Sequence, residues 1–256
     1  MCIPSEYFQL ANLSRLHSIH VEYDPRAGGP APPLLANLIE NHSSSLVNIR
    51  INYQFTSFDL SIVKAIGTCQ HLKSLSLNRV RLSLEELTGL LVACANVGQG
   101  TREEVGTDAT PEHRIGGLTT LCLEEFGSPR SELDLSHTLP PLSHLEHLRV
   151  VMMLGLSCDS KLRMLALCPN LKSLSWGRNI YERQLPAYQW AEHQESGMWP
   201  LLTSLDVSGE EFRDEILSRF INNSPSPFER LLTKGTGFGL LTYNSVISAE
   251  RHYNHI

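Results

Sequence analysis

A short apolar pattern, Leu-x-x-Leu-x-Leu, recurs along the chain and limits the folds that the chain can adopt. Its clearest copies lie in two eleven-residue segments, Cys69–Arg79 and Cys168–Arg178. Both segments contain Cys, Leu, Lys, Ser, Leu, Ser and Arg in the same order. Recurrence of one pattern in a chain is the sequence signature of architectures built by stacking similar units. We therefore predict a repeat protein.

Eight copies of the pattern can be found, the last of them degraded. Their first apolar residues are Leu16, Leu46, Leu72, Leu118, Leu145, Leu171, Leu202 and Phe228. Successive starts differ by 30, 26, 46, 27, 26, 31 and 26 residues. Six of these seven steps fall between 26 and 31 residues, which predicts about eight irregular repeats.

Each copy predicts a short strand, because its last two apolar residues alternate with polar ones. Such a strand buries its apolar face only when neighbouring units stack on it. Helical patterns lie between the copies. Ser83–Glu86 is a capping-box sequence before an apolar stripe, and Asp59 is a candidate N-cap. We predict further helices around residues 34–39, 162–167 and 212–221. The expected fold is an α/β solenoid with a parallel inner sheet and outer helices.

The one long step, of 46 residues, contains a polar insertion at residues 98–114 that has almost no apolar anchor. We expect a mobile loop there, and an ordered recognition element is the alternative. The rest of 1–256 is predicted to be one domain. Because the chain enters a repeat at Leu13 and ends near Arg251–Ile256 where another strand would begin, we expect a fragment of a longer solenoid.

Composition argues against several classes of function. The net charge is -6 at pH 7, which gives no basic field for nucleic acid. The longest apolar run, Val150–Leu154, is far too short to span a membrane. The six cysteines form no CxxC pair, which favours reduced thiols and an intracellular location, cytoplasmic or nuclear. Cys69 and Cys168 precede equivalent strands, and we expect both in the core.

No motif predicts catalysis, a cofactor or a metal. His137, His144 and His147 lack a carboxylate or cysteine at ligand spacing, and the pairs His17/His20 and His252/His255 lack the glutamate of a zinc-protease helix. The segment Gly235–Gly239 has neither GxGxxG spacing nor the Lys-Ser/Thr of a P-loop. We therefore expect no enzyme.

Strand parity predicts a different kind of site. If the Leu positions face the core, the polar residues beside them line the opposite, inner face of the sheet. Nine of these residues are our candidates for contact with a protein partner: His20, Arg50, Asn52, Ser76, Asn78, Glu124, Arg149, Ser175 and Asp206. Two interpretations stay open at this point, a partner-binding face and the solvated side of a sheet.

The Leu-x-x-Leu-x-Leu core and the Cys-Pro-Asn-Leu sequence at Cys168 resemble leucine-rich repeats of the ribonuclease-inhibitor-like kind. The segments Cys168–Gly177, Trp199–Ser208 and Gly235–Gly239 resemble fungal F-box-type leucine-rich-repeat proteins. The resemblance implies a curved horseshoe that binds proteins on its concave face. It also implies the substrate-recognition part of a ubiquitin-ligase subunit. We find no F-box in the chain, so a ligase adaptor is an expected partner only if an F-box lies outside it.

The leading hypothesis is a non-enzymatic scaffold for protein-protein interaction. A ligand-binding protein or enzyme that uses residues 98–114 as a lid is the second hypothesis. A degenerate fragment without function is the third.

Overall fold

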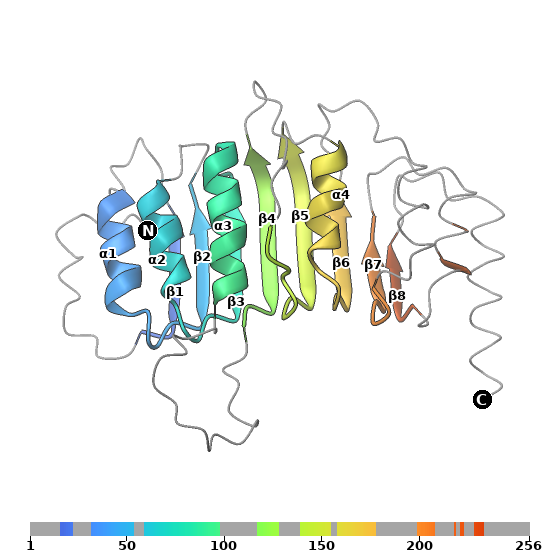
Figure 1. Cartoon of the computed structure of the whole chain (residues 1–256), viewed down its shortest axis with the longest axis horizontal. Coiled ribbons are helices and arrows are strands. Elements are labelled where there is room, and N and C mark those ends of the chain that lie inside the picture. The colour runs from blue at the N-terminus through green and yellow to red at the C-terminus, as the bar shows by residue number, and fades with distance from the viewer. Residues whose placement is uncertain are drawn as a thin grey trace, which may run out of the picture.

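Parallel strands at the predicted positions build one open sheet. In this computed structural model we describe residues 16–22, 32–53, 59–97, 117–127, 139–154, 158–177, 199–207, 218, 221–222 and 228–232. Eight strands lie within these ranges: β1 (Ser18–Glu22), β2 (Asn48–Asn52), β3 (Ser74–Asn78), β4 (Thr120–Gly127), β5 (His147–Leu154), β6 (Ser173–Gly177), β7 (Ser204–Asp206) and β8 (Arg230–Leu232). They follow one another in chain order across the sheet (Figure 1).

Every strand starts two residues after the first apolar residue of a copy of the pattern, as in Leu72 and Ser74. The predicted strands are thereby confirmed. The insertion at 98–114 lies outside the described residues. So do Gly235–Gly239, His137, His252, His255 and most of the helix predicted at 212–221.

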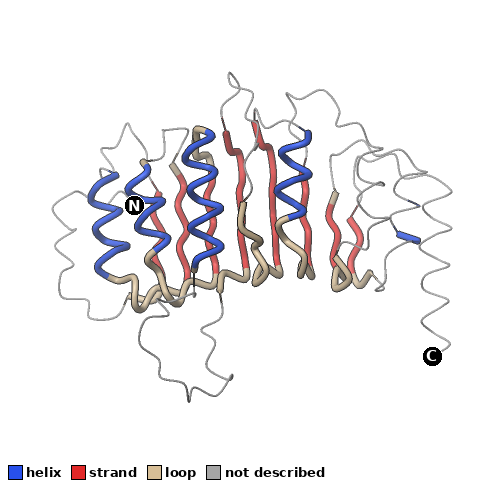
Figure 2. The backbone as a smooth tube through the Cα atoms, in the orientation of Figure 1, coloured by secondary structure: helices blue, strands red, loops and turns tan. Residues whose placement is uncertain are grey.

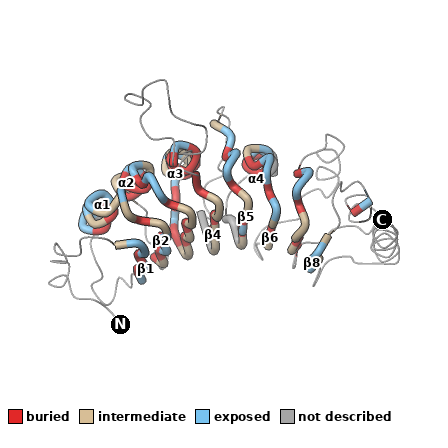
Figure 3. The backbone as a smooth tube through the Cα atoms, turned by 90° about the horizontal axis from the view of Figure 1, so that it is seen from below, coloured by how far each residue is buried: buried red, intermediate tan, exposed pale blue. Residues whose placement is uncertain are grey.

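Four helices are described between the strands, namely α1 (Pro32–Asn41), α2 (Leu60–Gly67), α3 (Leu84–Asn96) and α4 (Cys158–Ala166). All four cover the same face of the sheet (Figure 2). Viewed along the strand direction, the strands follow an arc, and the helices lie on its outer side (Figure 3). The predicted α/β class with a parallel inner sheet is confirmed, and this arrangement is compatible with a solenoid. We call the face opposite the helices the concave face.

Two predicted caps fix where helices begin. Asp59 Oδ1 accepts a hydrogen bond of 2.7 Å from Ser61 N at the start of α2. This backbone hydrogen bond lowers the pKa of Asp59. At α3 the capping box is complete: Glu86 N donates to Ser83 Oγ at 3.2 Å, and Ser83 N donates to Glu86 Oε2 at 2.6 Å.

A backbone hydrogen-bond pattern repeats at the entrance of the strands. The carbonyl of the residue just before a strand accepts two N–H groups from the next strand's entry. Lys73 O, for example, accepts from Thr119 N at 3.0 Å and Thr120 N at 2.9 Å. The same arrangement occurs at His17, Val47, Thr119, Glu146, Lys172 and Thr203. Because these bonds use only the backbone, they hold the same register across the sheet whatever the side chains are.

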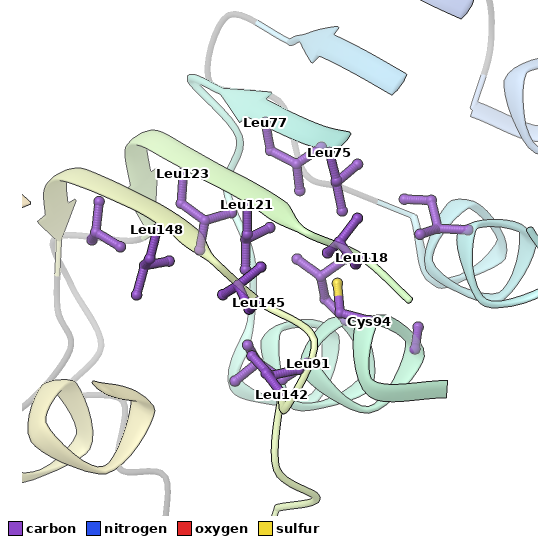
Figure 4. Packing of buried hydrophobic residues seen from close by; sticks show 14 of the residues in the cluster. Leu75, Leu77, Leu91, Cys94, Leu118, Leu121, Leu123, Leu142, Leu145 and Leu148 are labelled. Carbon is purple, nitrogen blue, oxygen red and sulfur yellow. The ribbon is translucent and has the colours of Figure 1, made fainter. Parts of the chain in front are cut away.

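The core lies between the sheet and the helices and uses alternate strand residues. Leu75, Leu77, Leu121 and Leu123 are fully buried. Replacing one such leucine by alanine typically costs about 2–5 kcal/mol. Figure 4 shows Cys94 of α3 near Leu118, Leu142 and Leu145.

With Ala95, Ser143 and His144, these four residues line a small pocket of about 10 Å³, at the lower limit of what holds one water molecule.

Candidate functional site

The concave face carries polar side chains in rows that cross the strands. One row, at the middle of the strands, runs through residues paired in register: His20, Arg50, Ser76, Cys122, Arg149, Ser175 and Asp206. The next row, toward the strand ends, contains Glu22, Asn52, Asn78 and Glu124. All nine residues predicted from parity belong to these two rows. None of them is buried, whereas the residues between them on each strand are buried.

Four of the nine form one hydrogen-bonded chain across β4 to β7, which we call the Arg149 cluster (Glu124, Arg149, Ser175 and Asp206). Arg149 Nε lies 2.5 Å from Glu124 Oε1. Arg149 Nη1 donates to Ser175 Oγ at 3.4 Å, and Ser175 Oγ donates to Asp206 Oδ2 at 3.2 Å. Residues from positions 124 to 206 in the sequence are thus brought together by the sheet register alone.

Within the Arg149 cluster, the guanidinium of Arg149 interacts with two carboxylates. The hydrogen bond to Glu124 raises the pKa of Arg149, and the charges of Glu124 and Asp206 act in the same direction. The Arg149 side chain remains 51% exposed, so the ion pair contributes little to stability. The cluster can order a polar surface across four strands.

Cys122 sits between Ser76 and Arg149 in the middle row. Parity placed it on this face, although it was not among the nine candidates. Burial raises the pKa of the Cys122 thiol, and the charge of Glu124 raises it further. The thiol is therefore protonated near neutral pH and is a poor nucleophile.

The N-terminal part of the face, on β1 to β3, has a different character. Arg50 is exposed at the centre of β2 and forms no ion pair with any residue that we describe. Asn52 and Asn78 are neighbours in register, and both are half-buried. On the outer side of this region His20 Nε2 lies 3.7 Å from Glu22 Oε1. The region presents one guanidinium, Arg50, and one carboxylate, Glu22, among neutral polar groups.

Cys69 and Cys168 are in the core, as predicted, with 1% and 0% of their surface exposed. Their thiols donate to the carbonyls four residues earlier: Cys69 to Ala65 O at 3.6 Å and Cys168 to Met164 O at 3.5 Å. Burial raises the pKa of Cys69, Cys94 and Cys168 to about 12. These thiols are therefore protonated near neutral pH and form part of the packed core.

Two of the histidines that were considered as metal ligands, His144 and His147, lie at the entrance of β5. His147 Nε2 is 4.0 Å from Glu146 Oε2, and Lys172 Nζ is 2.9 Å from Glu146 Oε1. His144 packs over Gly117, where an added Cβ would lie 2.7 Å from His144 Cδ2. Among the residues that we describe, no three His, Cys, Asp or Glu side chains gather where a metal ion could bind.

Comparison with known proteins gives no family. No protein-family model matches the chain, and no curated protein matches it. Within the described part of the chain, no helix has the length and apolar character needed to cross a membrane.

Proposed function

We propose that this protein is a non-enzymatic, leucine-rich-repeat scaffold that binds a protein partner on its concave face. In this proposal each of about eight irregular repeats supplies one strand to a horseshoe. The support comes from the recurrence of Leu-x-x-Leu-x-Leu at the eight strands, together with the curved sheet and its outer helices.

The observation that carries the proposal is the continuous polar face. Six strands place a polar or charged residue in the middle row, from His20 to Asp206, and β4 contributes Cys122 to the same row. Side chains in the neighbouring row are half-buried or exposed, and the Arg149 cluster joins four strands. A broad polar surface on a rigid sheet suits a macromolecular partner better than a small molecule, which requires an enclosed pocket.

Affinity purification with a matched set of variants tests this proposal. Ser76→Arg and Ser173→Arg add a large side chain to the concave face, and Asn37→Arg adds the same side chain to an exposed position of α1. Purified from the source cells, the parent chain should recover a specific protein. Both concave-face variants should lose most of it, whereas Asn37→Arg should retain it. Equal recovery by all variants would contradict binding on this face.

A narrower version makes the chain the substrate-recognition part of an F-box-type ubiquitin-ligase subunit. Its support is the resemblance of Cys168–Gly177 and Trp199–Ser208 to fungal proteins of that kind. Co-precipitation of a ligase adaptor with the full-length gene product tests it. Recovery of a partner without any adaptor would remove the ligase version and leave the scaffold.

We also propose an intracellular location, cytoplasmic or nuclear. Support comes from the four cysteines that we describe in full, which are all free thiols. Disulfides are rare in those compartments. Fractionation of the source cells, with antibody detection, checks this location.

A further inference from the structure

Arg50 lies where its guanidinium can pair with a group of a binding partner. It occupies the centre of β2, with His20 on one side and Ser76 on the other in register. Its side chain is exposed and has no hydrogen bond or ion pair within the described residues. Arg149, the other arginine of the middle row, is bonded to Glu124 and Ser175. The two arginines therefore differ in what they can offer to a partner.

The carboxylates of this face do not serve Arg50. Within the described part of the sheet they are Glu22, Glu124 and Asp206. Glu22 lies 3.7 Å from His20, Glu124 bonds to Arg149, and Asp206 accepts from Ser175. Over β4 to β7 the guanidinium of Arg149 is already bonded to Glu124, so it offers less to an incoming acidic group. Over β1 to β3, an incoming acidic group is stabilised most beside the guanidinium of Arg50.

Two asparagines add hydrogen-bond donors beside Arg50. The Oδ1 atoms of Asn52 and Asn78 are buried and find no hydrogen-bond partner among the residues that we describe. Both residues are nonetheless half-exposed, so the opposite end of each carboxamide, the Nδ2 group, is the accessible one. An NH₂ group is a donor only. The face at β2 and β3 therefore combines a guanidinium with two amide donors.

The arrangement of these residues suits an extended peptide. Arg50 and Asn52 are alternate residues of one strand, and their backbones lie about 7 Å apart along it. Asn78 is on the adjacent strand, whose backbone is about 4.8 Å away across the sheet. An acidic residue can place its carboxylate at Arg50 and a backbone carbonyl at the asparagines.

We propose that Arg50, Asn52 and Asn78 form the docking point for an acidic side chain of the partner polypeptide. This inference rests on the proposed function, because it assigns the chemistry of the partner at the same concave face. Arg50 pairs with the carboxylate, and the amide groups of Asn52 and Asn78 donate to the neighbouring peptide carbonyls.

Nuclear magnetic resonance with short peptides tests this docking point directly. The probes are the blocked peptides acetyl-Ala-Glu-Ala-Glu-Ala-amide and its Gln analogue, each added to the full chain at up to about 10 mM, which detects weak binding. The Glu peptide should shift the backbone amides of β2 and β3, and the Gln peptide should not.

Arg50→Gln should weaken binding of the Glu peptide about tenfold, as expected for the loss of a hydrogen bond between charged groups. Arg230→Gln is the matched control, because Arg230 is an exposed arginine of the same sheet, on β8. It should leave the shifts at β2 and β3 unchanged.

Three results would overturn the docking point. They are equal shifts with both peptides, no shift at β2 and β3 at the highest concentration, and shifts caused by inorganic phosphate but not by the Glu peptide. The proposed function is judged separately, by the partner recovered with the concave-face variants. If that partner depends on Ser76 but not on Arg50, the scaffold stands and the acidic docking point falls.

Discussion

At the scale of single residues, the cysteines show how environment decides chemistry. Cys69 and Cys168 lie just before strands, donate to carbonyls four residues earlier and are fully buried. Cys122 has the same thiol but lies half-buried on the concave face. Burial disfavours the thiolate at all three, most strongly in the core. A cysteine in the core thus keeps its proton and serves to pack the interior.

The raised pKa of Cys168 predicts a loss of stability in alkali. The pKa of this thiol is about 8.5 in the unfolded chain and about 12 in the folded chain. Between these values the unfolded state releases the proton and the folded state keeps it. The contribution is fully present below about pH 8.5, and stability falls as pH rises toward 12 by up to about 1.4 kcal/mol per pH unit.

Urea unfolding at several pH values measures this loss. Cys168→Ala should fall less steeply with pH than the parent chain. Leu171→Ala is the control, because it removes a buried side chain of the same region that does not titrate. It should lower stability by a constant amount and keep the parent slope. A Cys168→Ala slope equal to that of the parent would show that the thiol ionises without unfolding.

At the scale of elements, helix starts depend on a few side-chain hydrogen bonds. Ser83 and Glu86 satisfy each other's backbone N–H groups at α3, and Asp59 does the same for Ser61 at α2. These groups have no partner inside the helix, so the cap supplies the missing bonds. The buried stripe of α3 is then held against the sheet by Leu87, Leu90 and Leu91.

Ser83→Ala should lower the free energy of unfolding by about 1 kcal/mol, the usual effect of losing an N-cap. Ser83→Asp should retain most of the stability, since its carboxylate can accept the same bond. Ser44→Ala, in an exposed turn, is the neutral control. Urea denaturation distinguishes the three. If Ser83→Asp were as unstable as Ser83→Ala, the cap would not be the cause.

At the scale of the whole molecule, the sheet continues across the longest interruption in the pattern. β3 and β4 pair in the ordinary register, with Leu75 beside Leu121, although their sequence separation includes residues 98–114. The Lys73 carbonyl accepts two N–H groups at this junction, as its counterparts do at the others. Pairing at this junction therefore follows the same strand register and entrance bonds as at the others.

Deletion of residues 98–114, with a short glycine linker in their place, should leave cooperative unfolding intact. Loop-closure free energy changes slowly with length, so the expected change in stability is within about 1 kcal/mol. Thermal unfolding followed by circular dichroism gives this value. Partner recovery should also be unchanged. Loss of binding with an intact fold would favour the second hypothesis, in which the insertion acts as a lid.

Much of the fold followed from the sequence, because side chains of a strand alternate between two faces. That period of two assigned Leu75 and Leu77 to the core and Ser76 and Asn78 to the concave face. Equivalent residues of neighbouring copies pair in register in the structure, although the copies start 26 to 46 residues apart. The equivalent positions of Cys69 and Cys168 before their strands predicted that both lie in the core. The pattern could not predict the eight-residue lengths of β4 and β5, where pairing continues to Gly127 and Leu154.

What the sequence by itself determined is which residues share the concave face, since parity is a local property of each strand. Only the tertiary structure decided how those residues differ. Arg50 and Arg149 occupy the same row, yet Arg149 is bonded to Glu124, and Arg50 has no such bond within the described part of the chain. The side chains that surround each arginine belong to other strands, and they decide its partners and its rotamer. Burial of the Asn52 and Asn78 oxygens likewise depends on packing across strands, and a single strand's sequence does not contain it.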